Sequence, residues 1–161
     1  MPFRDTKKTH PQDSINGEFM KKSIGLISLL FCSILNAQTI SEVINSVDTV
    51  LLNLTLNEFS GEIPTLVEGS SVTILNRGSN QNGTAADYIT EKFESYDNLT
   101  VEQVDYSANG TNIVATQTGE TNPDDIYIIC AHYDALADYC ANDNATGTVA
   151  VLEIARILSN Y

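Results

Sequence analysis

The sequence predicts an α/β fold in which helices flank a mixed β-sheet. Apolar residues recur at helical spacing in three stretches, residues 39–59, 84–96 and 148–160. Between the second and third stretches lie two β-type runs joined by an Asn-Gly turn, followed by a continuous apolar run at residues 126–130. Because helices and strands each bury one apolar face against another layer, this order of elements predicts strands packed between helices.

Charge and composition restrict the partners of the chain. At 161 residues a single main domain is expected, and residues 38–161 carry 18 acidic and three basic residues, a formal net charge of −15. Such a surface repels nucleic acid and anionic membranes, so we expect neither as a partner. Solubility is the simplest reason for the charge, and attraction of a metal or a cationic substrate is the functional alternative.

The N-terminal region has the pattern of a targeting segment. Residues 1–19 are polar and aperiodic, and Met20 opens a short basic segment that is followed by an apolar run and by Ala37. This is the pattern of a secretory signal peptide at residues 20–37, and its apolar run is too short to span a membrane. We therefore predict a secreted or periplasmic protein with a mature part at residues 38–161. Residues 1–19, before the signal peptide, are predicted to be an over-extended start or a disordered leader.

Two cysteines remain after the predicted cleavage. In an oxidising compartment Cys130 and Cys140 can form a disulfide. The alternative is that Cys130 is a small apolar residue in a strand core, because apolar residues flank it on both sides. The sequence leaves the pairing open.

Each predicted helix has one apolar face that we expect to pack on the sheet. Along the chain these faces are Val43, Val47, Val50, Leu51 and Leu54; then Ala85, Tyr88, Ile89, Phe93 and Tyr96; then Val151, Ile154, Ala155 and Leu158. On the outer side of the last helix Glu153 and Arg156 are spaced to pair. Turn residues predict loops at residues 61–64, 69–71 and 77–83.

The strands are predicted from two further patterns. Residues 99–106 and 111–118 are β-type runs joined through Asn109-Gly110, which predicts an antiparallel hairpin. Residues 126–130 lack alternation between apolar and polar side chains, which predicts a strand buried on both faces.

One histidine and two aspartates follow this predicted strand. Side chains alternate along a strand, so His132 and Asp134 are expected on one side, while Asp143 comes shortly before the last helix. An imidazole can bind a cation while a carboxylate holds its ring, and a second carboxylate can bridge two metal ions. The simpler alternatives are a structural hydrogen-bonded pair and a helix N-cap. Together the residues predict half of a metal site where open α/β sheets bind ligands.

The segments 130–134, 141–147 and 152–156 read CAHYD, ANDNATG and LEIAR. They closely resemble the co-catalytic zinc aminopeptidases of peptidase family M28, the relatives of bacterial leucyl aminopeptidase. The resemblance is strongest over residues 126–158. It implies a three-layer zinc-exopeptidase-like fold, two zinc ions and the release of N-terminal residues from peptide substrates.

The same resemblance assigns roles to individual residues. It implies that His132 is a ligand of one zinc ion, that Asp143 bridges both zinc ions, and that Asp134 is the catalytic-site partner that orients His132. It also makes the Asp143–Asn144 peptide bond a candidate for the cis form.

The remaining residues of such a site are absent from the sequence. The family's adjacent Glu pair, its later acidic ligand and its final His come after the position of Tyr161, so we expect a truncated, N-terminal fragment that is inactive alone. Glu153 is no substitute for the base, because its family counterpart is structural. Alternatives are a non-catalytic binding module on the same fold and a relative of the glutaminyl cyclases. Residue specificity and oligomeric state are left undetermined.

Overall fold

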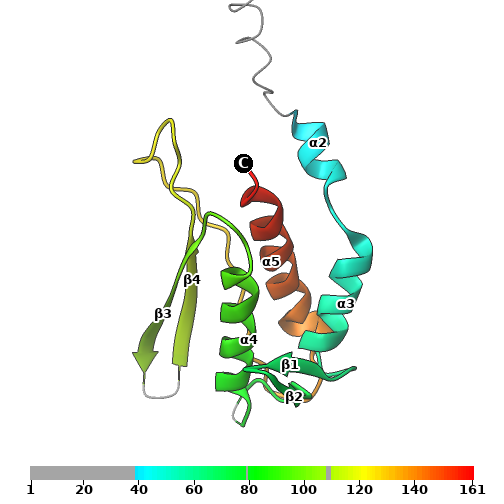
Figure 1. Cartoon of the computed structure of the whole chain (residues 1–161). Coiled ribbons are helices and arrows are strands. Elements are labelled where there is room, and N and C mark those ends of the chain that lie inside the picture. Colours follow the sequence, from blue (N-terminus) through cyan, green and yellow to red (C-terminus); the bar gives the residue numbers. More distant parts are fainter. Residues whose placement is uncertain (1–38, 79, 108–109) are drawn as a thin grey trace, which may run out of the picture. The chain divides into compact units, whose positions relative to one another are not determined.

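The computed structural model describes residues 39–78, 80–107 and 110–161, where pairs of strands lie between helices along the chain (Figure 1). Residues 40–161 form one compact unit. The predicted leader and signal peptide lie outside the described residues. The elements are α2 (Ile40–Asn45), α3 (Thr49–Phe59), β1 (Thr65–Val67), β2 (Ser70–Val72), α4 (Asn82–Glu94), β3 (Thr100–Ser107), β4 (Gly110–Thr116), a wide π-type turn η1 (Ala141–Ala145) and α5 (Thr146–Leu158).

The strands form two separate antiparallel pairs, β1 with β2 and β3 with β4. The second pair is the predicted hairpin, with Thr100 opposite Thr116 and an irregularity between Asp105 and Ser107. The α/β class, with strands flanked by helices, is confirmed. In place of one mixed sheet, the described residues form these two separate antiparallel sheets.

The β1–β2 hairpin replaces a predicted loop. Residues 69–71 were expected to be irregular, but Ser70 and Ser71 pair with Val67 and Leu66. Glu68 and Gly69 connect the strands with positive φ values of 49° and 73°. Two consecutive positive φ values give a tight turn whose twist matches that of an antiparallel strand pair. The residues that predicted a loop therefore form the turn of a hairpin.

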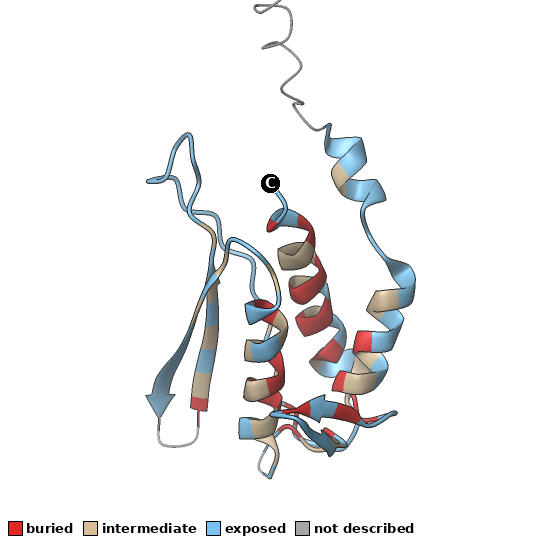
Figure 2. Ribbon diagram, viewed as in Figure 1, coloured by how far each residue is buried: buried red, intermediate tan, exposed pale blue. Residues whose placement is uncertain are grey.

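The core lies where α3, α4 and α5 face one another, as the buried faces in Figure 2 show. α4 packs against the β3–β4 hairpin and also against α5 and β1. The face predicted for α4 is confirmed, with Tyr96 partly buried at its end. The central residues of the core are Phe59, Val67, Ile74, Ala85, Tyr88, Ile89, Phe93, Ala145, Val149 and Leu152.

The single helix predicted over residues 39–59 is wrong, because the chain breaks between α2 and α3. Asp48 adopts an extended conformation, and its carboxylate accepts hydrogen bonds from the backbone N–H groups of Val50 and Leu51 at 2.9 Å. A side-chain acceptor in this position is an N-cap, which starts a new helix.

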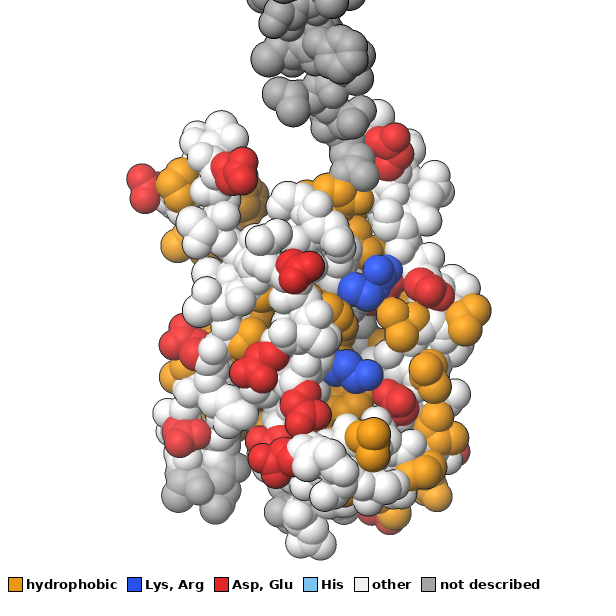
Figure 3. All heavy atoms as spheres, in the orientation of Figure 1, with side chains coloured by type: hydrophobic (Ala, Val, Ile, Leu, Met, Phe, Trp, Pro, Cys, Tyr) orange, Lys and Arg blue, Asp and Glu red, His pale blue; other side chains and the backbone are white. Residues whose placement is uncertain are grey.

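The apolar face predicted for α3 is also wrong. Val50 is 78% exposed and Leu54 is exposed as well, and hydrophobic side chains gather over α3 on the surface in Figure 3. The face that packs on the core lies on the other side of the helix, at Leu52, Thr55, Leu56 and Phe59. Because α3 is apolar on most sides, two stripes have helical spacing, and the pattern alone does not choose between them.

Within the described residues, no helix is long and apolar enough to cross a membrane.

The predicted face of α5 needs a similar correction. Leu158 is exposed, and the buried side chains of α5 are Thr148, Val149, Leu152, Glu153 and Ile157. Glu153 and Arg156 do pair, with Arg156 Nε 2.7 Å from Glu153 Oε2. The pair lies on the inner side of the helix rather than on its outer side, since Glu153 is buried against the break before α3.

Glu153 joins α5 to that break. Its Oε1 accepts a hydrogen bond from the backbone N–H of Asp48 at 2.8 Å, and Arg156 Nη2 donates to the carbonyl of Ser46 at 2.8 Å. Hydrogen bonds from Arg156 and from the Asp48 backbone lower the pKa of Glu153, although burial opposes them. The ionised carboxylate is therefore favoured in the folded state.

Replacing Glu153 with Gln should destabilise the protein in a pH-dependent way. The folded pKa lies below the unfolded one, so the carboxylate stabilises the fold above the unfolded pKa and loses this effect as the pH falls through the folded pKa. We expect a loss of about 1.5–3 kcal/mol at pH 7, the range for hydrogen bonds to charged groups, and a smaller difference near pH 3. Urea unfolding at both pH values measures it. The exposed Glu62→Gln variant is the control, and an equal loss at both pH values would contradict this role.

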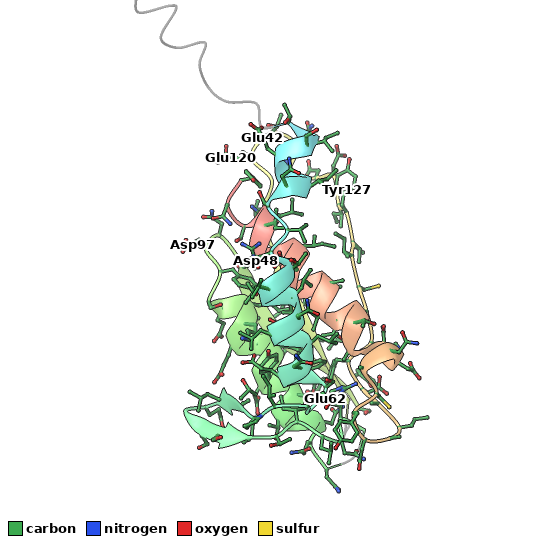
Figure 4. The ribbon with its side chains drawn as sticks, turned by 90° about the vertical axis from the view of Figure 1, so that its right-hand side faces the viewer. Glu42, Asp48, Glu62, Asp97, Glu120 and Tyr127 are labelled. Atoms are coloured by element: carbon green, nitrogen blue, oxygen red, sulfur yellow. The ribbon has the colours of Figure 1, made fainter. Side chains whose placement is uncertain are left out.

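The buried strand predicted at residues 126–130 is wrong. These residues are irregular, with Ile126, Tyr127 and Ile128 81%, 90% and 82% exposed; Tyr127 is labelled in Figure 4. A doubly buried strand needs neighbouring strands and a covering layer, and no strand of the described part pairs with this segment. Cys130 is likewise exposed instead of lying in a core, and Cys130 and Cys140 are both free thiols.

All three basic side chains of the described residues are engaged by neighbouring groups. Arg77 is fully buried, Lys92 Nζ lies 3.3 Å from Glu58 Oε2, and Arg156 contacts Glu153. The acidic side chains are spread over the surface seen in Figure 3. The excess negative charge therefore faces solvent.

Candidate metal site

The three side chains singled out from the sequence lie together. His132 Nε2 is 3.3 Å from Asp143 Oδ1, and His132 Nδ1 is 3.2 Å from Asp134 Oδ1. The imidazole therefore has one carboxylate on each side. All three side chains are open to solvent, at 54% for His132, 58% for Asp134 and 86% for Asp143, so an ion or a substrate can reach them.

Asp134 holds the ring of His132 from the Nδ1 side. Both its carboxylate and its backbone carbonyl oxygen lie within hydrogen-bonding distance of Nδ1, at 3.2 and 3.3 Å. Two acceptors on this side favour the tautomer with the proton on Nδ1. The lone pair of Nε2 then faces Asp143, which is the arrangement of a metal-binding histidine held by a carboxylate.

The spacing between Nε2 and the Asp143 carboxylate fits a shared zinc ion. Zinc binds histidine nitrogen and carboxylate oxygen at about 2.0–2.2 Å in tetrahedral geometry, which separates two ligand atoms by about 3.4 Å. The observed separation is 3.3 Å. His132 and Asp143 are therefore spaced as two ligands of one ion. No group of three or more His, Cys, Asp and Glu able to hold a metal occurs within the described ranges.

The histidine is positioned by hydrogen bonds to its own backbone and to the side chain of Tyr133, and not by the predicted strand. Thr148, in the first turn of α5, donates from Oγ1 to the carbonyl of His132 at 3.1 Å. The hydroxyl of Tyr133 donates to Asn82 Oδ1 at 3.1 Å and lies 3.0 Å from the carbonyl of Thr111 in β4. Burial raises the pKa of Tyr133, which keeps this hydroxyl protonated. The histidine is thus fixed from α5, α4 and β4.

Asp143 is presented by η1, directly before α5. The Asp143–Asn144 peptide bond is cis, as the resemblance implied. The side chain of Asn144 accepts a hydrogen bond from the N–H of Gly147 at 3.1 Å. Any side chain at position 147 would collide with that of Asn144, so glycine leaves room for this contact.

Arg77 is a residue of the site region that sequence reasoning missed. It lies in the segment predicted as a loop at residues 77–83, yet it is completely buried beneath the site. Burial lowers the pKa of the guanidinium, while Cys140, Asp134 and Asp143 oppose that shift. Arginine remains charged under such conditions. The signal that the sequence offered was its rarity, since Arg77 is one of three basic residues in the acidic part at residues 38–161.

Comparison with known proteins relates the region of this site to a peptidase family. Residues 112–161, which contain His132, Asp134, Asp143 and α5, match the model of Peptidase family M28. This segment, less than a third of the chain, is therefore similar to peptidase family M28. No solved structure matches the chain significantly.

Curated relatives of this chain include three proteins named probable zinc metalloproteases. The one from Leptosphaeria maculans is 33% identical over 75 residues, which cover 41% of this chain and 17% of the relative. The one from Pyrenophora teres f. teres is 29% identical over 89 residues, covering 50% and 18%. One from Pyrenophora tritici-repentis is 32% identical over 105 residues, covering 49% and 24%. The chain thus spans a small part of the length of the relatives it matches.

Proposed function

We propose that this chain is part of a zinc-dependent metallopeptidase, and specifically of an aminopeptidase that releases N-terminal residues from peptides. The observation that carries the proposal is the pair of His132 Nε2 and Asp143 Oδ1, 3.3 Å apart, with the opposite ring nitrogen held by Asp134. The match of residues 112–161 to the model of Peptidase family M28 and the names of the relatives support zinc as the metal.

Each residue has a defined part in the proposed reaction. His132 would offer its Nε2 as a ligand, Asp134 would fix the orientation of the ring, and Asp143 would supply a carboxylate whose two oxygens could serve two zinc ions. Zinc supplies Lewis acidity, which polarises the carbonyl of the scissile peptide. The exposed carboxylates and the acidic surface also favour the positive N-terminus of a peptide substrate, which supports aminopeptidase specificity.

The proposed centre needs further ligands. A catalytic zinc ion usually has at least three protein ligands, and a two-metal centre has more. We assign His132 and Asp143 as two of them, and the part of the chain that the structure describes holds no group of three such side chains able to bind a metal. The signal-peptide pattern at residues 20–37 supports export to a secreted or periplasmic location as part of the same proposal.

The test uses the protein encoded by the complete reading frame that contains this sequence. We expect it to release p-nitroaniline from an aminoacyl p-nitroanilide, to lose this activity with a zinc chelator and to regain it with added zinc. The same substrate with an acetylated N-terminus is the matched control and should not react. Cleavage of the acetylated substrate would contradict the aminopeptidase assignment. A purified protein that neither retains zinc nor cleaves would favour a non-catalytic binding module.

A further inference from the structure

The buried guanidinium of Arg77 contacts the segment that connects the two sides of the site. Its Nε donates to the carbonyl of Tyr133 at 2.9 Å, and its Nη1 and Nη2 donate to the carbonyls of Tyr139 and Cys140 at 2.9 and 3.0 Å. Nη1 also donates to the carbonyl of Phe59 at 3.0 Å. Three of these four carbonyls belong to residues between His132 and Asp143, so one side chain holds both ends of the connecting loop, residues 133–140.

The end of this loop has an unusual backbone. Tyr139 and Cys140 are consecutive non-glycine residues with positive φ values of 62° and 40°. Such conformations are costly for residues with a side chain and persist only where surrounding contacts enforce them. The carbonyls of these same two residues accept hydrogen bonds from Arg77. They also directly precede η1, so their conformation determines where Asp143 is directed.

Residues 75–78, the segment that carries Arg77, pack directly against the loop. Tyr139 N–H donates to the carbonyl of Leu75 at 3.0 Å, and Asn76 Nδ2 donates to Asp138 Oδ1 at 3.1 Å. A side chain at Gly78 would collide with the carbonyl oxygen of Ala135. The loop therefore lies directly on the segment before α4, with Arg77 at the centre of the contact.

We propose that Arg77 is a positioning residue of the metal site: by holding the carbonyls of Tyr133, Tyr139 and Cys140, it sets the separation between His132 and Asp143. This inference rests on the proposed zinc-dependent function. Arg77 acts through the backbone and does not touch a substrate or a metal. Its positive charge near Asp134 and Asp143 opposes cation binding, so its contribution is geometric.

Only arginine supplies the required donors. Its planar guanidinium directs N–H groups along several fixed directions, whereas a lysine ammonium is a single compact centre with three donors. Arg77 also lies over the ring of Phe59, 4.9 Å from the ring centre, which fixes the plane of the guanidinium. Arg77→Lys retains the charge and loses the geometry, so it separates the two contributions.

The test compares Arg77→Lys and Arg77→Met with wild type in the protein encoded by the complete reading frame. The matched control is Arg156→Lys, since that guanidinium bonds Glu153 and Ser46 and contacts none of the loop. Amide hydrogen exchange of residues 133–145 reports the loop without any metal. Zinc titration followed by the imidazole NMR signals of His132, assigned with His132→Gln, reports the site. Both are measured at a temperature where every variant is folded by circular dichroism.

Both Arg77 variants should speed amide exchange in the loop by at least about tenfold and leave the exchange rates of α4 unchanged. Without the hydrogen bonds from Arg77, the loop opens locally more often. Zinc affinity should fall about 10- to 100-fold, as expected when a residue supporting the ligands is lost. Adding Cys140→Gly to Arg77→Lys should recover part of the affinity, because glycine adopts positive φ freely. The Arg156→Lys variant should leave the loop exchange and the zinc affinity unchanged.

Unchanged loop exchange in both Arg77 variants would overturn the proposal. Faster exchange with unchanged zinc affinity would overturn the positioning role. If the wild-type protein from the complete reading frame binds no zinc, the proposed function fails, and the exchange comparison still decides whether Arg77 holds the loop.

Discussion

Replacing Asp143 with Asn is expected to lower zinc affinity about 100-fold. Zinc binding at four-ligand protein sites is worth about 10–16 kcal/mol in total, so one ligand accounts for about 3 kcal/mol, or two orders of magnitude. Asparagine has nearly the same shape as aspartate and lacks its charge, so the change tests the carboxylate itself. Competition with a zinc chelator, or NMR titration where binding is weak, gives the affinity.

The control for this substitution is Asp138→Asn. Asp138 lies in the same loop, and its carboxylate accepts a hydrogen bond from Asn76 instead of facing His132. The Asp138→Asn substitution removes the same charge from the same region. It should change zinc affinity by less than about threefold, since the attraction between charges separated by solvent is weak. Equal losses in both variants would show that general charge, and not ligation by Asp143, holds the ion.

Replacing Phe59 with Ala is expected to destabilise the protein by about 3–5 kcal/mol, the usual cost of deleting a buried aromatic side chain. Phe59 is fully buried and stacks on Tyr88, with ring centres 5.5 Å apart. Its ring also lies against Arg77, so its loss opens a cavity under the loop of the metal site. Urea unfolding monitored by circular dichroism measures the free energy of unfolding.

Val50→Ala is the matched control on the same helix. Val50 is 78% exposed, so its truncation should change stability by no more than about 0.5 kcal/mol. The sequence pattern assigns Val50 to the packed face, and the structure assigns Phe59 there. A larger loss at Val50 than at Phe59 would contradict the packing of α3.

The candidate site could be predicted largely because its residues are close together in the sequence. His132, Asp134 and Asp143 lie within one short segment, and the turn before α5 carries a distinctive pattern. Their proximity did not require the predicted strand at residues 126–130, which is irregular and exposed. The contact between His132 and Asp134 forms between residues two positions apart, so local geometry suffices for it.

Arg77 shows why other features were beyond sequence reasoning. Its hydrogen bonds to residues 133–140 join positions 56 to 63 apart, and nothing in a Gly- and Asn-rich loop signals that one of its side chains is buried. The same limit applies to α3 and α5, where several apolar stripes compete. Which stripe packs is decided by neighbouring elements, as when Glu153 turns inward to meet Asp48.

The engagement of Arg77, Lys92 and Arg156 by neighbouring groups has a consequence for how ions approach. With the acidic side chains facing solvent, mobile cations accumulate near the surface and anions such as phosphate are depleted there. Divalent ions gain most from this enrichment, which extends over about 10 Å at 0.1 M salt. Association of zinc with the chain should therefore slow as ionic strength rises.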